Sequence, residues 1–241
     1  LMKKIITHWG EIKPSVIIFP IYYLLIIYGI IYFLSFNFFN YFFTKEDSFI
    51  EWMQFIGYFC SFLISLSICF IKKDRFSKQK IFWFLFAIFC FCIAGEEISW
   101  GERLTNIGIE SVKNINLQGE TNFHNLKNIN NYLHFSFIFL GLFFGWAGWK
   151  FWPNIEALPK KKYTLFFLIV SAFYFYFDLS WITLGNRIPN HQETIEFLMS
   201  SGLFLHCFNG PVFFFDRSMW YSFRRDVQIQ RYTPLPRSNR S

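Results

Sequence analysis

The sequence predicts an all-α fold, a polytopic membrane bundle of about six transmembrane helices. Hydrophobic residues make up 54% of the 241 residues and charged residues only 16%, which is too few charges to cover a water-soluble domain of this length. The apolar residues occur in runs of about 20, the length at which a helix crosses the hydrocarbon core of a bilayer. A globular cytosolic enzyme and disordered, collagen-like or disulfide-framework chains are therefore excluded.

Six charge-poor runs give the expected spans in order. The first begins after Lys13, has Pro14 in its first turn and covers about 15–36, with a bend expected at Pro20. Charges, asparagine clusters or proline bound the other five runs, which cover about 49–71, 81–100, 130–152, 163–184 and 193–215. No internal repeat interrupts this series. One membrane domain is therefore expected at 1–215, followed by a basic cytoplasmic tail at 216–241.

The distribution of basic residues orients the bundle, because Lys and Arg in short loops stay on the cytoplasmic side of a membrane. With the N-terminus inside, 18 of the 23 Lys and Arg residues fall in cytoplasmic segments and five in outer segments. Both termini are therefore predicted to be cytoplasmic. Basic loops beside anionic headgroups explain the net charge of +7, so no nucleic-acid partner is expected.

Ionisable residues from four of the spans are expected at one depth. Glu96 lies about 24 Å up the third span at 1.5 Å per residue, and Asp178 lies equally far up the fifth. Glu193 and Glu196 share a face at the outer start of the sixth span, and His134 lies one turn below the outer end of the fourth. Because intramembrane carboxylates are costly unless paired, protonated or hydrated, this layer is a hypothesis for a functional site. Interfacial solvation of Asp178 and a plain acidic helix start at Glu193 and Glu196 are the alternatives.

The segment GEEISWGER, at the end of the third span, fits two interpretations. In the first, the helix frays here, Trp100 joins the aromatic belt, and Glu96 and Glu97 both lie in water. In the second, the helix continues, so that Glu96, Ser99 and Arg103 form one stripe. Arg103 would then neutralise Glu96 or an anionic substrate.

The outer connection at 104–131 is the longest in the chain and is rich in amide side chains. Its central segment, QGETNFHN, offers hydrogen-bond donors, acceptors and an imidazole within eight positions, and loops of this length usually have a function. A solvated hydrophilic lid is the alternative interpretation. Together with the last outer loop, the candidate substrate-binding residues are Ser99, Trp100, Arg103, Gln118, Glu120, Asn122, Asn125 and Arg187.

Three histidines toward the outer side are candidate metal ligands, namely His124, His134 and His191. Convergence of these imidazoles with the carboxylates would give the mixed nitrogen and oxygen ligands that zinc, iron or manganese accept. A divalent metal is therefore a candidate cofactor. A bound lipid is expected as well, because the phenylalanine-rich surface suits lipid, and the sequence names no other cofactor.

Two of these segments resemble the motifs of a bacterial family of uncharacterised multi-span membrane proteins. In that family GEEISWGQR is followed by an NxQGETNLHN-type segment, and the chain has GEEISWGER and QGETNFHN at the matching places. Glu102 stands here where the family pattern has Gln, and Phe123 where it has Leu. The match covers about thirty residues tightly and the rest only as alternating spans. The family carries no assigned reaction, so the resemblance implies only that the outer polar segments belong together.

Three functions fit this arrangement. The first is a membrane enzyme that acts from the outer side on a lipid or lipid-linked substrate, with Glu96 and Glu97 as acid and base candidates and Arg103 as an anion contact. The further candidate catalytic carboxylates are Asp178, Glu193 and Glu196.

The second hypothesis is a non-catalytic accessory or structural subunit of a larger membrane complex, with lipid or pigment bound to it. Gly141, Gly145 and Gly148 form a small-residue stripe on the fourth span, which fits either internal packing or contact with another membrane subunit. The aromatic surface and the C-terminal tail are further candidate contacts. A proton-coupled transporter is the third hypothesis, although the sequence pattern lacks the inverted repeats and broken helices typical of transporters.

Overall fold

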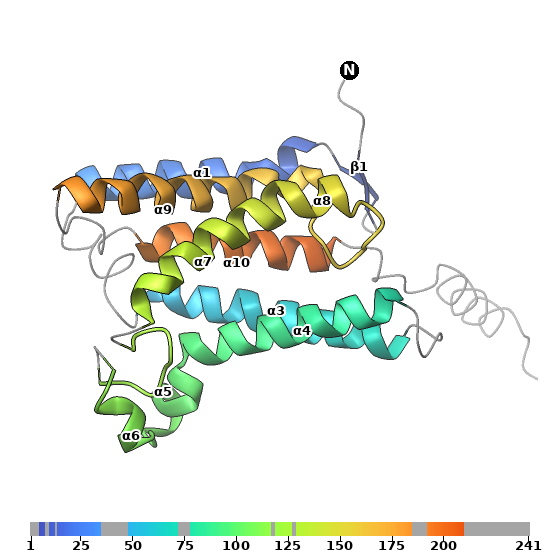
Figure 1. Cartoon of the computed structure of the whole chain (residues 1–241). Coiled ribbons are helices and arrows are strands. Elements are labelled where there is room, and N and C mark those ends of the chain that lie inside the picture. Colours follow the sequence, from blue (N-terminus) through green and yellow to red (C-terminus); the bar gives the residue numbers. More distant parts are fainter. Residues whose placement is uncertain are drawn as a thin grey trace, which may run out of the picture.

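Long helices occur in each of the six predicted runs (Figure 1). The computed structural model describes residues 5–7, 10–12, 14–34, 48–71, 78–116, 119–126, 129–184 and 192–209. The long helices are α1 (Pro14–Leu34), α3 (Phe49–Ile71), α4 (Lys78–Glu97), α7 (Asn130–Leu142), α9 (Thr164–Leu184) and α10 (Gln192–Phe208).

Shorter elements join or extend these helices. A π-helical turn, η3 (Phe143–Ala147), continues α7 into α8 (Gly148–Phe151), and a 3-10 turn, η4 (Lys161–Tyr163), leads into α9. The remaining elements are the antiparallel strands β1 (Ile5–Thr7) and β2 (Gly10–Ile12), the 3-10 turn η2 (Ser99–Gly101), and the single-turn helices α5 (Glu102–Thr105) and α6 (Glu110–Lys113).

Three stretches of the described helices are long and apolar enough to cross a membrane, namely Phe49–Phe70, Lys78–Glu97 and Tyr132–Phe151. The expectation of a helical membrane protein is confirmed at this level. The third predicted run is shifted toward the N-terminus, because α4 begins at Lys78 and ends at Glu97. Residues 210–215 of the sixth run and the tail at 216–241 lie outside the described residues.

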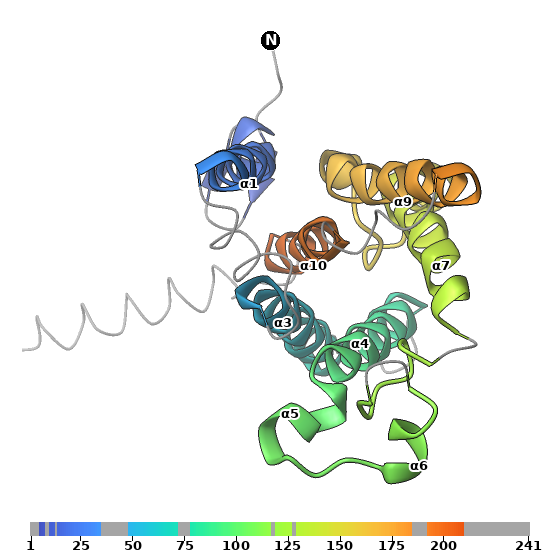
Figure 2. The same cartoon turned by 90° about the vertical axis from the view of Figure 1, so that its left-hand side faces the viewer.

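The helices pack as a series in which each contacts the next. α4 packs against α3, α3 against α10, α10 against α9, and α9 against α7, so that α4 and α7 form the two ends of the series. Figure 2 shows α10 between α3 and α9. It also shows α1 beside α10, on the side away from α7. Ile21 of α1, 2% exposed, belongs to the common core.

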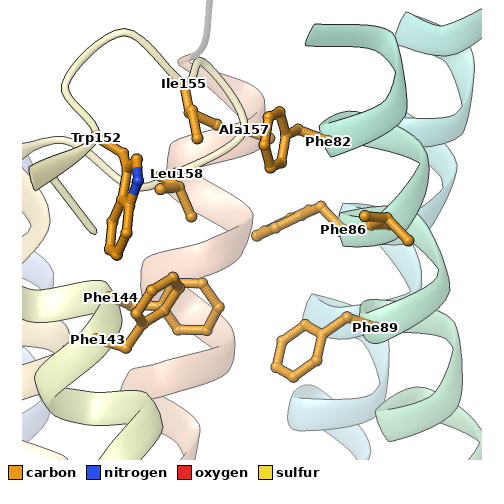
Figure 3. A pocket seen from close by; sticks show the side chains of 10 residues that line it. Phe82, Phe86, Phe89, Phe143, Phe144, Trp152, Ile155, Ala157 and Leu158 are labelled. Carbon is orange, nitrogen blue, oxygen red and sulfur yellow. The ribbon is translucent and has the colours of Figure 1, made fainter. Parts of the chain in front are cut away.

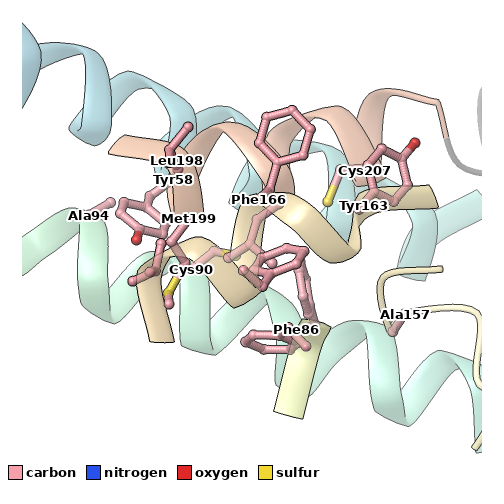
Figure 4. Packing of buried hydrophobic residues seen from close by; sticks show 14 of the residues in the cluster. Tyr58, Phe86, Cys90, Ala94, Ala157, Tyr163, Phe166, Leu198, Met199 and Cys207 are labelled. Carbon is pink, nitrogen blue, oxygen red and sulfur yellow. The ribbon is translucent and has the colours of Figure 1, made fainter. Parts of the chain in front are cut away.

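The core is built from large apolar side chains of four helices (Figure 4). Tyr58 of α3 and Cys90 of α4 lie beside Leu198 of α10, and each of them is at most 1% exposed. Phe166 of α9 is equally buried and continues the cluster toward Phe86. This packing holds the polar ends of the helices in fixed positions relative to one another.

The glycine stripe on the fourth run is an internal packing surface. A Cβ atom added to Gly141 would lie 2.6 Å from the Cβ of Ser171, and one added to Gly145 would lie 2.9 Å from Leu168, both on α9. Gly148 is also buried, 3.5 Å from Leu158 by the same measure. Small residues allow this close approach of helix backbones. α9 and the loop after α8 therefore pack against the stripe, which supports the internal-packing interpretation.

Candidate functional site

The chain reverses direction immediately after α4, at η2. Three consecutive residues here have positive φ angles, namely Ser99 (48°), Trp100 (54°) and Gly101 (92°). These angles lie in the left-handed region, which residues other than glycine rarely adopt. Gly95 makes the reversal possible, because a Cβ on it would lie 3.0 Å from the indole ring of Trp100. The expectation of one continuous helix carrying Glu96, Ser99 and Arg103 as a stripe is therefore wrong.

Glu96 binds the loop that follows this reversal. We call residues 98–126 the cap; α5 and α6 lie within it, at the end of the bundle where α4 ends (Figure 1). The Oε2 atom of Glu96 accepts hydrogen bonds from the backbone N–H groups of Phe123 (2.7 Å) and His124 (3.0 Å), and its Oε1 accepts one from Trp100 Nε1 (2.5 Å). The imidazole Nδ1 of His124 lies 3.3 Å from Oε2. Both oxygens of Glu96 are thus occupied by the cap.

A carboxylate within the cap, Glu120, gathers three further predicted residues. Glu120 Oε2 accepts hydrogen bonds from Ser99 Oγ and Asn122 Nδ2, each at 2.7 Å, and lies 3.2 Å from Arg103 Nη2. Ser99 is 1% exposed and Asn122 is fully buried. A second guanidinium nitrogen of Arg103, Nη1, lies 2.7 Å from Oε1 of Glu51 on α3. This network joins the two sequence segments of the resemblance and attaches them to the bundle.

An ion pair on the outer side of the cap orders α5 against α6. Lys113 Nζ lies 2.5 Å from Glu102 Oε1, and the backbone N–H of Thr121 donates to Glu102 Oε2 at 2.7 Å. The bond from Lys113 lowers the pKa of the Glu102 carboxyl, with the bond from Thr121 acting in the same direction, and the bond to Glu102 raises the pKa of Lys113. Gly108 allows this contact, since a Cβ there would lie 2.3 Å from the Lys113 side chain.

Beneath the cap, acidic side chains face the interior of the bundle. Glu97, the last residue of α4, interacts electrostatically with Glu193 and Glu196 of α10 and with Glu51. The carboxylate of Glu193 accepts a hydrogen bond from Gln54 Nε2 at 2.8 Å, and the carbonyl of the same residue accepts another at 3.1 Å. We call Glu97, Glu193 and Glu196 the carboxylate cluster.

Two tyrosines complete the surroundings of the cluster. The hydroxyl of Tyr174 on α9 donates a hydrogen bond to Oε1 of Glu196, a residue that is 7% exposed. The buried phenol of Tyr58 is in electrostatic contact with Glu97 and Glu196. A phenolic hydroxyl can both donate and accept hydrogen bonds, so the two tyrosines provide polar groups between the carboxylate cluster and the apolar core.

Two buried polar atoms beside the cluster have no hydrogen-bond partner among the described residues. They are Oε1 of Gln54, whose side chain is fully buried, and Oγ1 of Thr194, which is 2% exposed. Leaving a buried acceptor or hydroxyl unpaired costs about 1–3 kcal/mol. Native structures tolerate few such atoms, and those that occur are often connected with function.

The candidate metal ligands do not gather within the described part of the chain. His134, 5% exposed, packs its ring against Tyr174 with centroids 5.3 Å apart, whereas His124 contacts Glu96 in the cap. No group of three His, Cys, Asp or Glu side chains that could hold a metal occurs in the described ranges. Within the described ranges His124 and His134 have separate partners, and His191 lies outside these ranges, so the metal site stays a prediction.

The predicted layer of ionisable groups forms in part. Glu196 and His134 both contact Tyr174, so α7 and α10 do meet at one level through α9. Glu96 instead turns to the cap, and Glu97 takes the inward position. Asn125 is a half-buried residue of the cap. Gln118 and Arg187 lie outside the described residues, as does the side chain of Asp178.

Sequence reasoning did not assign site roles to four residues, namely Glu51, Gln54, Tyr174 and Thr194. The spacing of Glu51 and Gln54 in the sequence could have indicated that they belong to the site. Glu51 and Gln54 lie three residues apart at the outer start of the second run, which places them on one helix face at the depth of the other carboxylates. Tyr174 and Thr194 carry no comparable pattern, because single hydroxyls in apolar helices are common.

No family model, no curated protein and no solved structure matches this chain.

Proposed function

We propose that the protein is a six-span membrane enzyme that acts from the outer side of the membrane on a lipid or lipid-linked substrate. The carboxylate cluster would be its active site. One observation carries this proposal: Glu97 interacts electrostatically with Glu193 and with Glu196, which is 7% exposed, while the nearby Arg103 is already bound by Glu51 and Glu120. Like charges in such surroundings need a shared proton, a cation or a substrate group to balance them.

The chemistry that this arrangement favours is general acid and base catalysis. Of two interacting carboxyl groups, one can hold a proton while the other accepts one, which is the combination that hydrolysis or group transfer requires. Gln54 fixes the position of Glu193, and Tyr174 fixes that of Glu196. Glu97 has no such hydrogen-bond partner among the described residues, so we assign it the role of the group that meets the substrate. Glu96, which the sequence suggested as an acid or base, instead holds the cap in this proposal.

Six spans with both termini in the cytoplasm are part of the same proposal. Helices at all six predicted runs support the number, and the excess of Lys and Arg in alternate connections supports the orientation. In this orientation the cap and the carboxylate cluster lie at the outer end of the bundle. A substrate from the outer leaflet would reach them without crossing the membrane.

The proposal can be tested through the lipids of the native host. A strain that lacks the gene is complemented with the wild type, Glu97→Gln, Glu196→Gln or the control Glu110→Gln, and total lipid extracts are compared by mass spectrometry. Gln keeps the shape of the side chain but removes its charge and proton. Glu110 is an exposed cap residue, so its variant matches the chemical change away from the cluster.

Lipid species that change in the deletion strain should return with the wild type and Glu110→Gln, but not with the two cluster variants, at equal protein levels in the membrane. Restoration by both cluster variants would show that the carboxylates are not catalytic and would favour the accessory-subunit function. A deletion that changes no lipid would exclude this substrate class.

A further inference from the structure

An apolar pocket of about 470 Å³ lies between α4 and the π-helical turn η3 (Figure 3). Phe82, Phe86 and Phe89 line it from α4, and Phe143 and Phe144 line it from η3. The loop after α8 contributes four more residues, among them Trp152. The pocket is separate from the carboxylate cluster, since Glu97 lies about 12 Å farther along α4 than Phe89 at 1.5 Å per residue.

The position of the pocket follows from the order of helix packing. α4 and α7 are the two ends of the packed series, so none of the described helices lies between them on the side where the series is open (Figure 2). The π-helical turn lies in the continuation of α7 at this level, and π-turns are rare and frequently found at functional sites. Leu85, which lines the pocket, is 54% exposed. In a membrane this opening faces the hydrocarbon chains of the lipids.

The end of the pocket near the start of α4 is closed by a side-chain amide. Gln79 Nε2 donates a hydrogen bond to the carbonyl of Asn154 at 2.6 Å, and its Oε1 accepts one from the backbone N–H of Glu156 at 2.9 Å. These two bonds hold the loop after α8 against α4. A ligand therefore enters from the side, between α4 and α7, and not through the end of the bundle.

The lining and the volume define the chemistry of the ligand. All ten lining residues are hydrophobic, and the indole of Trp152 is the one polar group among their side chains. A pocket of this volume with an entirely hydrophobic lining suits a flexible hydrocarbon chain. One acyl chain of an ordinary membrane lipid has this chemistry.

Lysine residues surround the closed end. Lys78 is exposed in the first turn of α4, and Lys161 is exposed in η4. Lys160 Nζ donates hydrogen bonds to the carbonyls of Pro153 (2.8 Å) and Ile155 (3.0 Å), in the same loop that lines the pocket. An anionic headgroup is therefore the one that this end of the bundle would attract.

We propose that the pocket between α4 and η3 holds one acyl chain of an anionic phospholipid, which enters sideways between α4 and α7 with its headgroup near the lysines. This inference does not rest on the proposed catalytic function, because it concerns a different end of the bundle. Occupation of the pocket would fill the space between the two ends of the helix series and so stabilise the bundle.

Two substitutions fill the pocket from opposite walls. Leu85→Trp adds an indole from α4, at a position exposed enough to accept the larger ring without displacing the core, and Phe143→Trp does the same from η3. Ile88→Trp is the matched control, because Ile88 is a 45% exposed aliphatic residue of α4 that does not line the pocket. Thermal unfolding of each variant verifies that it is folded.

The test is photocrosslinking of the full chain in nanodiscs that contain phosphatidylglycerol with a diazirine in one acyl chain, followed by peptide mapping. Labelling should concentrate on residues 143–158 and on the start of α4 in the wild type and Ile88→Trp, and should fall several-fold in both filling variants. Labelling spread evenly over all exposed apolar helix faces, or undiminished in both filling variants, would overturn the proposal. Equal labelling by phosphatidylcholine with the same diazirine would overturn the assignment of an anionic headgroup.

Discussion

The guanidinium of Arg103 lies 2.7 Å from the carboxylate of Glu51, with each side chain only 10% exposed. Its second nitrogen lies 3.2 Å from Glu120. One side chain of the cap is thus bound both to α3 and to the far part of the cap itself. The cap is therefore held over the carboxylate cluster by contacts among polar groups, and removing these contacts should loosen the cap without unfolding the apolar core.

Arg103→Gln should destabilise the attachment of the cap by about 3 kcal/mol, because removing one partner leaves a nearly buried charge unpaired. Proteolysis of the cap in detergent-solubilised protein would measure this loss. Lys113→Gln is a suitable control, since its ion pair with Glu102 is more exposed and should matter less. Equal protease resistance of the wild type and Arg103→Gln would contradict the role of this pair.

Glu96→Gln should open the cap at Phe123 and His124. The amide has one acceptor oxygen where the carboxylate had two, and its NH2 group would meet either the Trp100 indole N–H or the backbone donors. Each bond to a charged acceptor contributes about 1.5–3 kcal/mol. Hydrogen exchange of the segment around residue 123 should therefore quicken in Glu96→Gln and stay unchanged in Glu97→Gln. Identical exchange in the two variants would argue against the anchor.

The ion pair between Glu102 and Lys113 should make the order of the cap depend on pH. The pKa of Glu102 is lowered in the folded protein, chiefly by the bond from Lys113, so the stabilisation is complete above the ordinary carboxyl value of 4.5 and is lost as the pH falls through the lowered pKa. The raised pKa of Lys113 sets the limit at high pH. The stabilisation by the ion pair is complete below pH 10.5 and is lost as the pH rises through the raised pKa of Lys113.

Protection of the Thr121 amide, which donates to Glu102, would report this dependence. After correction for the intrinsic exchange rate, protection should be constant near neutral pH and decline in acid. Glu102→Gln removes the titrating group. In this variant, protection of the Thr121 amide should show no such decline in acid. A wild-type profile without the transition would show that the pair does not order this part of the cap.

Gly141→Ala should separate α7 from α9. The added methyl group would lie 2.6 Å from the Cβ of Ser171 and 2.8 Å from the carbonyl oxygen of Phe167, and overpacking of this kind costs about 1–3 kcal/mol. Gly29→Ala is the matched control, because no atom lies within 4 Å of the corresponding position on α1. Thermal unfolding in detergent should show a lower midpoint for the first variant only; equal midpoints would contradict the close packing.

The proposed orientation makes a direct prediction for reporter fusions. A fusion at Lys78 and one after Arg225 should be active on the cytoplasmic side, because both positions lie in segments rich in Lys and Arg. A fusion near Gln118 should be active on the outer side. An outer location of Lys78 would invert the bundle and place the carboxylate cluster toward the cytoplasm.

The long helices could be predicted from the sequence, because a bilayer requires runs of about 20 apolar residues and charges mark their ends. The reversal at Ser99 and Trp100 could not. A helix that ends in this segment was one of the two interpretations, but serine and tryptophan normally avoid the left-handed region, so the sequence did not indicate this conformation. The conformation depends on the indole packing against Gly95, a contact that becomes visible only in three dimensions.

The sequence also could not predict which of two adjacent glutamates, Glu96 or Glu97, faces the interior of the bundle. Successive side chains on a helix point about 100° apart, so Glu96 and Glu97 face different surroundings, but the sequence does not say which faces the interior. The pairing of Glu51 with Arg103 joins residues of different helices, and no local pattern encodes it. The helices that carry the polar groups were predictable, whereas the partners of these groups depended on tertiary packing.

The three members of this ion-pair network leave the ribosome in the order Glu51, Arg103, Glu120. When α3 first reaches the membrane, its glutamate has no guanidinium to pair with, and a lone charge is costly within a bilayer. The end of α3 that carries Glu51 should therefore stay at the water interface until α4 emerges and brings Arg103. The cap then closes when Glu120 follows, before α7, α9 and α10 are made. The network thus favours an assembly order in which the α3–α4 hairpin and its cap form first and serve as a template for the later helices.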